Sequence, residues 1–207
     1  MSQFFHIHPD NPQGRLIHQA VNIIKQGGVI VYPTDSGYAI GCGLGEKKAM
    51  DRILTIRRVD KNHNFTLVCK DLSEIATFAR VDNTAFRIIR SLTPGPYTFI
   101  FKGTKEVPKR VLNDKRRTIG IRVPDNRIAL ELLAELGEPL MSSTLLLPGD
   151  EFAESDPDEM RSRLEKQVDL IIHGGYLGEK PTSVVDFSEG EPVIIRRGED
   201  DVSQFEA

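Results

Sequence analysis

Residues 27–43 read Gly-Gly-Val-Ile-Val-Tyr-Pro-Thr-Asp-Ser-Gly-Tyr-Ala-Ile-Gly-Cys-Gly, and they include the side chains best suited to bind a small polar ligand. The β-branched and aromatic residues predict a buried strand that stops at Pro33, which has no backbone N–H to donate. Residues 34–37 then offer hydroxyls, free N–H groups and a glycine, which suit either a ligand-binding loop or a tight structural turn. The helical pattern resumes near Glu46, where a helix N-terminus would favour an anion.

A second chemically distinctive stretch, residues 102–122, is basic and ends in a predicted strand. Arg122 alternates there with apolar neighbours, so its side chain should project from one sheet face or into a cleft. A guanidinium in that position needs either an anionic ligand or a salt bridge to a nearby carboxylate, and the spacing leaves both open. The other cations of the stretch are Lys102, Lys105, Lys109, Arg110, Lys115, Arg116 and Arg117.

Composition and length narrow the class of protein. The chain has 207 residues and a net charge of −3, which argues against a uniformly basic surface. No apolar run is long enough to span a bilayer, and the first residues lack a signal-peptide pattern, so we expect a cytoplasmic protein without a membrane partner. Cys42 and Cys69 lack the spacing of a zinc site and are expected to be free core thiols, with no structural metal.

Apolar periodicity predicts helices intermingled with strands along the whole chain. This pattern is typical of one α/β domain, with a core over residues 14–198 and a frayed tail over residues 199–207. No Walker loop, Rossmann fingerprint, nucleophile elbow or HExxH motif occurs. Helices are predicted over residues 13–26, 46–56, 72–78, 84–92, 128–136 and 160–167, and strands over residues 29–32, 65–69, 97–101, 118–124, 139–144, 168–172, 182–187 and 192–196.

Six short motifs, taken in order, resemble those of the YrdC-like (threonylcarbamoyl-AMP synthase) family. Residues 33–41 resemble its PTET-x-YGLG loop, residues 94–98 its PGP-x-T, and residues 120–125 its G-x-R-x-P-D. Residues 139–143 resemble the approach to its SAN loop, residues 181–186 its PSTVVD strand, and residues 195–198 its LRxG. Each motif is weak alone, but the ordered set covers nearly the whole chain and is most similar to the YciO branch.

The resemblance implies a twisted, open, mixed α/β sheet with helices packed against it and a basic concave face. It also implies an activity: threonylcarbamoyl-AMP synthesis from L-threonine, bicarbonate and ATP with Mg²⁺, for tRNA modification. This nucleotidyl transfer needs cations and hydrogen-bond donors around phosphates rather than a covalent nucleophile.

By position within the family motifs, Arg57, Arg58 and Thr144 would be catalytic. The substrate or nucleotide would contact Thr34, Tyr38, Arg122, Ser142, Ser183 and Arg196, and no residue would hold a metal.

Two departures from the family pattern concern catalysis. Arg57 stands for the Lys of the family's K-x-R and Val59 for its Arg, although a one-residue slip would let Arg58 serve there. Thr144 stands for the Ser of S-x-N, and Leu146 for its Asn. Losing one hydrogen bond that tightens in the transition state costs about 2–4 kcal/mol, so these departures predict a weak or altered enzyme.

A binding protein without catalysis is the alternative interpretation. The basic concave face would then recognise tRNA or double-stranded RNA through its phosphates, with Lys115, Arg116 and Arg117 as contacts. The loop around Thr34 favours the enzyme interpretation, because it suits a small-molecule pocket better than a duplex.

Overall fold

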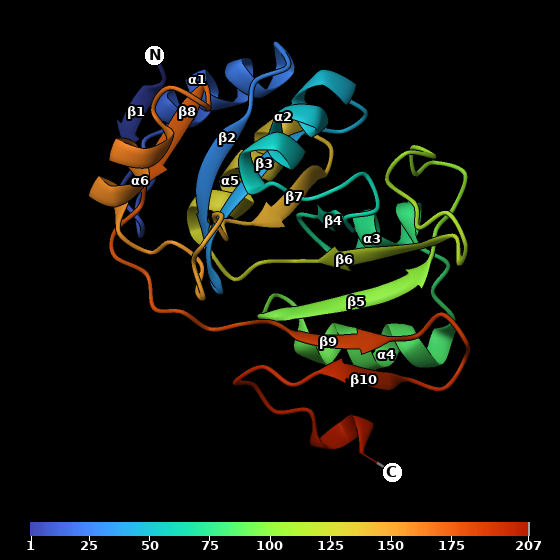
Figure 1. Cartoon of the computed structure of the whole chain (residues 1–207). Coiled ribbons are helices and arrows are strands. Elements are labelled where there is room, and N and C mark those ends of the chain that lie inside the picture. The colour runs from blue at the N-terminus through green and yellow to red at the C-terminus, as the bar shows by residue number, and fades with distance from the viewer. Residues whose placement is uncertain (207) are drawn as a thin grey trace.

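The computed structural model, described here over residues 1–206, is built around a sheet of ten strands in the order β1-β8-β2-β3-β7-β4-β6-β5-β9-β10 (Figure 1). Parallel and antiparallel pairs are mixed, as the family resemblance implies. The strands are β1 (Gln3–His6), β2 (Ile30–Thr34), β3 (Gly37–Gly43), β4 (Thr66–Val68), β5 (Tyr97–Lys102), β6 (Thr118–Arg122), β7 (Leu140–Thr144), β8 (Leu170–His173), β9 (Ser183–Asp186) and β10 (Val193–Arg196). The helices are α1 (Gly14–Lys25), α2 (Lys47–Arg57), α3 (Leu72–Phe78), α4 (Asn83–Leu92), α5 (Arg127–Leu136), α6 (Pro157–Leu164) and the short 3₁₀ helix η1 (Ser203–Phe205).

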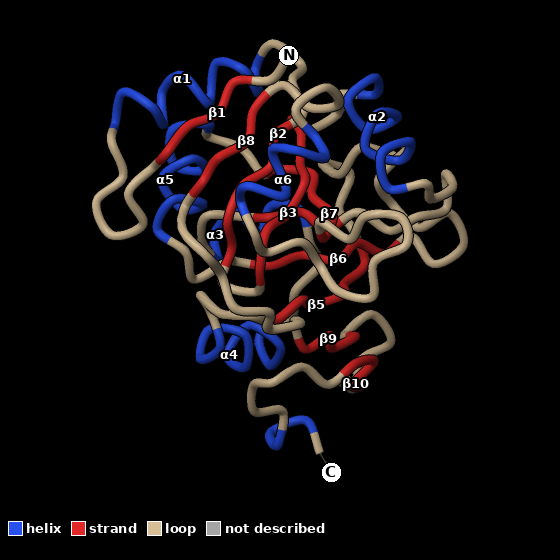
Figure 2. Tube along the Cα trace, turned by 60° about the vertical axis from the view of Figure 1, so that its left-hand side comes forward, coloured by secondary structure: helices blue, strands red, loops and turns tan. Residues whose placement is uncertain are grey.

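The two faces of the sheet carry different helices. Helices α1 and α5 lie together on one face and bury their apolar sides against β2, β8 and one end of β7 (Figure 2). Helices α2, α3, α4 and α6 contribute to the larger apolar cluster on the opposite face. Because α1 and α5 cover only part of their face, the remainder is left for polar side chains.

Most predicted elements agree with the structure, and their caps show why. Asp82 accepts a hydrogen bond from the Ala85 backbone at the start of α4, as its N-cap position predicts. Gly137 ends α5 at a φ of 78°, a conformation that glycine adopts without a steric penalty.

The strand predicted to stop at Pro33 is longer, and the strand after it was missed. Strand β2 continues through Pro33 and Thr34, residues 35–36 form a tight turn, one of the two alternatives, and residues 37–43 form β3, for which no element was predicted. Proline is tolerated because β8 pairs with β2 only at Ile30 and Val31, so Pro33 breaks no ladder bond on that side. Gly41 is needed because a Cβ there would lie 3.1 Å from both the Met141 carbonyl oxygen and the Tyr32 ring.

The C-terminal segment, where a frayed tail is expected, places two apolar side chains against the domain. Val202 and Phe205 are buried, and the Phe205 ring packs edge-on against Phe187 with centroids 6.0 Å apart. The Tyr97 hydroxyl donates to the Asp201 carbonyl at 2.9 Å. Burial of the two apolar side chains, Val202 and Phe205, explains why the segment packs against the domain. Ala207 lies outside the described residues.

We expect Phe205→Ala to destabilise the protein by about 2–3 kcal/mol, because the truncation leaves a cavity against Phe187. Denaturant unfolding measures the change. The matched control is Ile195→Ala on β10, whose side chain is 56% exposed and should matter little. Equal, small effects of both changes would mean that the segment is frayed in solution.

Candidate functional site

A cavity of about 580 Å³ lies on the part of the sheet face that α1 and α5 leave uncovered. Its floor consists of alternate residues of neighbouring strands, because side chains in a strand point to opposite faces in turn. Many of these side chains carry hydroxyls, so the floor offers hydrogen bonds instead of an apolar surface. The floor residues include Thr66, Thr98, Gly120, Ser142, Thr144, Thr182 and Val184.

Gly120 keeps the centre of this floor open. A Cβ at this position would make ordinary contacts, 3.4 Å from the Thr98 methyl and 3.5 Å from the Thr66 hydroxyl. The glycine is therefore not required by local packing, and any larger side chain there would extend into the cavity.

Arg122 lines the cavity. Of its two predicted partners, an anionic ligand and a carboxylate, the structure shows the carboxylate. Its guanidinium forms an ion pair with Asp35 and donates to the Ser36 hydroxyl at 2.8 Å. Asp35 also accepts from the Asp125 backbone N–H at 2.9 Å. The side chains of Arg122 and Asp35 are only 7% and 11% exposed, and the Arg122 Nε is buried without a partner among the described residues.

Thr34 and Tyr38 both line the cavity, on opposite sides of the β2–β3 turn. The Thr34 hydroxyl donates to the Gly37 carbonyl at 2.6 Å, which closes the turn. The Tyr38 hydroxyl donates to the Gly175 carbonyl and accepts from the Gly174 N–H, so it holds the segment after β8 beside the turn. Burial raises the pKa of Tyr38 to about 12, which keeps this phenol protonated.

Ser142 lies on the floor, where its hydroxyl is 2.7 Å from the Tyr32 hydroxyl. Burial raises the pKa of Tyr32 to about 12, and the hydrogen bond to Ser142 offsets part of that rise. The pair fixes the position of the Ser142 hydroxyl next to the cavity.

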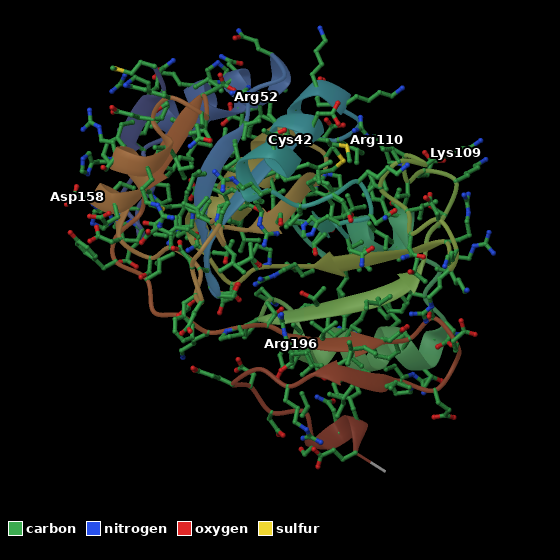
Figure 3. The ribbon with its side chains drawn as sticks, in the orientation of Figure 1. Cys42, Arg52, Lys109, Arg110, Asp158 and Arg196 are labelled. Atoms are coloured by element: carbon green, nitrogen blue, oxygen red, sulfur yellow. The ribbon has the colours of Figure 1, made fainter. Side chains whose placement is uncertain are left out.

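The far end of the cavity contains Arg196, which lies beside β9 (Figure 3). Its guanidinium donates to the Thr182 carbonyl at 2.8 and 3.0 Å and to the Thr182 hydroxyl at 2.8 Å. Ser183, the predicted contact, is fully buried and accepts from the Gly198 N–H at 2.9 Å. Strand alternation turns Ser183 away from the cavity and presents Thr182 instead.

Arg57 is not among the residues that line the cavity, but it contacts two that are, Ser143 and Leu146. Its Nε donates to the Leu146 carbonyl at 3.1 Å, and one terminal nitrogen contacts both the Ser143 hydroxyl and the His63 Nε2. The His63 Nε2 also lies 2.8 Å from the Ser143 hydroxyl. Burial and then the Arg57 charge lower the pKa of His63, which favours the neutral ring that can accept these bonds.

The other two predicted catalytic residues differ in where they lie. Thr144 ends β7 and lines the cavity. Arg58 takes a left-handed conformation, with φ of 52°, and lines a separate hollow beside Leu147 and Arg163, so the structure does not bring it to the site. His63 was missed by the sequence reasoning, since a lone histidine has no ligand spacing.

The predicted RNA contacts do not form one group. Arg116 lines the cavity and forms an ion pair with Asp186 at 2.8 Å. Lys115 and Arg117 are exposed outside the cavity lining. Two of the three arginines that line the cavity, Arg116 and Arg122, are thus paired with carboxylates.

Within residues 1–206, no three His, Cys, Asp or Glu side chains are grouped so that they could hold a metal ion. The same residues form no helix with the length and apolar character needed to cross a membrane. Cys42 and Cys69 are free and buried, and burial raises the pKa of Cys42 to about 12, so this thiol is unreactive.

The chain is thus an α/β protein with a twisted mixed sheet and a hydroxyl-lined cavity beside a Thr-Asp-Ser turn. The Sua5/YciO/YrdC family model, described as Telomere recombination, matches residues 22–198, and the chain belongs to this family. It is 64% identical over 205 residues to the Uncharacterized protein YciO of Escherichia coli K12, covering 99% of this chain and 100% of that protein. The crystal structure of E. coli YciO gives a TM-score of 0.95 over the same shares of the two chains.

More distant relatives have names that state an activity. The Threonylcarbamoyl-AMP synthase of Coxiella burnetii is 30% identical over 178 residues, covering 84% of this chain and 94% of that one. The structure of P. abyssi Sua5 complexed with L-threonine shares the fold, with a TM-score of 0.90 and 19% identity over 99% of this chain and 60% of that one.

We predict that Asp35→Ala costs about 3–5 kcal/mol of stability, because it leaves the buried Arg122 charge unpaired. Asp51→Ala is the matched control, since Asp51 pairs with Arg110 at the surface and its loss should cost about 0–1 kcal/mol. Urea unfolding of both variants measures the difference. Similar costs for the two would show that the Arg122 pair is solvated.

Proposed function

We propose that this protein binds a nucleotide and a small amino acid in the sheet-face cavity and forms an adenylate, as threonylcarbamoyl-AMP synthases do, but slowly on L-threonine. The observation that carries this proposal is the cavity itself, where hydroxyls, three arginines and the Thr34 turn line one space in a chain of this family. A volume of about 580 Å³ suits a ligand of nucleotide size.

For adenylate formation, the protein has to position the reactants and neutralise the charge on the phosphates. A carbamate oxygen attacks the α-phosphate of ATP, and pyrophosphate leaves. Arg196 and Arg116 would neutralise phosphate oxygens, and the floor hydroxyls would donate to them. Mg²⁺ would enter on the phosphates of ATP, which is how proteins usually take this ion when no carboxylate cage is present.

The amino acid would bind beside the β2–β3 turn, where Thr34 lines the cavity. The family resemblance assigns Thr34 this role, and the name of the P. abyssi Sua5 structure records L-threonine bound to that relative. Tyr38 supports the proposal because its hydroxyl fixes the segment at Gly174 and Gly175 that lies beside the turn.

The slow rate is expected from the two departures from the family pattern. Arg57 keeps a cation and Thr144 a hydroxyl, but Val59 and Leu146 supply no hydrogen bond to the reacting groups. Arg57 is also engaged by Ser143, His63 and the Leu146 carbonyl, so phosphate would compete with these contacts.

Incubation with ATP, Mg²⁺, bicarbonate and L-threonine should release pyrophosphate slowly. Arg57→Ala should lower the rate by about 10²-fold, as expected when one charge-assisted donor to the transition state is lost. The double change Val59→Arg/Leu146→Asn should raise it by at least tenfold, because each restored donor is worth about 10²–10³ in favourable geometry.

Lys109→Ala is the matched control, because Lys109 is an exposed cation on the loop between β5 and β6, outside the cavity lining (Figure 3). Its rate should equal that of the unchanged protein. No pyrophosphate from any variant, with ATP bound normally, would overturn adenylate formation and leave only nucleotide binding.

A further inference from the structure

The segment after β7 presents an aromatic ring to the cavity from a fixed loop. Phe152 lines the cavity and its side chain is 67% exposed. The other large apolar side chains exposed to this degree within residues 1–206 lie outside the cavity lining. A single exposed aromatic residue is ordinary at a protein surface, so the argument depends on the position of Phe152 in the cavity lining, next to Leu146.

The loop around Phe152 is anchored on both sides of the ring. Arg163 of α6 forms ion pairs with Asp150 at 2.8 Å and with Glu154 at 3.1 Å. The Glu154 N–H donates to the Leu145 carbonyl at 2.9 Å, which ties the loop back to the end of β7. Because residues 150 and 154 are both tied down, the backbone at Phe152 has less freedom, and binding would cost less entropy there.

Leu146 lines the same cavity from the start of this loop. Leu146, Glu151 and Phe152 together form what we call the mouth of the cavity. Two of the three are apolar and the third is an acid, so a pyrophosphate group would meet no cation among these side chains. An uncharged apolar group would instead bury surface against Leu146 and Phe152.

We propose that the mouth is a subsite for an apolar acyl group, and that the natural ligand is an adenylate whose acyl part is aliphatic or aromatic. This inference rests on the proposed adenylate binding and goes beyond it by naming the acyl class. The nucleotide occupies the hydroxyl floor between Thr98 and Thr182, and the acyl chain extends past Thr144 to Phe152.

The test uses stable sulfamoyl analogues of acyl-adenylates with acetyl, butanoyl, hexanoyl and benzoyl groups, titrated by calorimetry into the full chain. Each buried methylene contributes about 0.8 kcal/mol, and burial of half of the added surface predicts about tenfold tighter binding of the hexanoyl than of the acetyl analogue. The benzoyl analogue should also bind more tightly than the acetyl one, because its ring can pack against Phe152.

In Phe152→Ala, the hexanoyl analogue should bind only about twofold more tightly than the acetyl analogue. Phe152→Leu should keep most of the difference in affinity. Tyr176→Ala is the matched control, since Tyr176 is an aromatic residue of similar exposure, 70%, outside the cavity lining, and it should leave this difference unchanged. Melting temperatures check that the variants stay folded.

Two results would overturn the inference and separate it from the proposed function. Equal affinity for all four analogues, or a gain that Phe152→Ala leaves intact, would refute the apolar subsite while adenylate binding stands. Failure of every analogue to bind would refute adenylate binding and the inference with it.

Discussion

The buried ion pair between Arg122 and Asp35 is the interaction on which the site depends. It joins the end of β6 to the tip of the β2–β3 hairpin, two elements separated by β7 and β4 in the sheet order. Ser36 and the Asp125 N–H complete its hydrogen bonds, so the turn that carries Thr34 has one position over the floor. A buried charge without this partner would be costly, and the geometry of the turn is therefore tied to the stability of the fold.

The pleat of the sheet explains how one domain provides both a stable core and a polar cavity. Within β5, β6 and β7, one set of alternate residues packs under the helices of the larger core, and the other set faces the cavity. The floor therefore belongs to the sheet, whereas Val59 and Leu146, the two departures from the family pattern, lie in loop segments. Loops change more freely than strands, so these two positions can vary while the cavity persists.

Sequence reasoning predicted the order and type of nearly all elements, because their apolar periodicity and caps are local signals. It failed at Pro33, where the missing partner on one side of β2 permits a proline that local rules place in a loop. It also left open whether Arg122 meets an anionic ligand or a carboxylate, because its partner Asp35 is distant along the chain. No sequence pattern pointed to His63 or Phe152. His63 matters because it contacts Arg57, and Phe152 because its loop is anchored beside the cavity.

The resemblance assigned residues by motif, and the structure separates those that reach the cavity from those that do not. Thr34, Arg122 and Arg196 line it, whereas Arg57, Arg58 and Ser183 do not. The alternation of side chains along a strand explains why Ser183 faces away from the cavity. A sequence motif does not state which face of the sheet each residue takes. The left-handed backbone at the end of α2 accounts for Arg58.

The affinity of Gly120→Val for Mg²⁺-ATP shows whether the hydroxyl floor is the ligand site. A Cβ at residue 120 makes only ordinary contacts with Thr98 and Thr66, so the variant should fold with a melting temperature close to that of the unchanged chain. Its side chain would fill the centre of the floor, and we expect the affinity to fall by at least tenfold. An unchanged affinity in a folded Gly120→Val protein would show that the nucleotide binds elsewhere and would contradict the account.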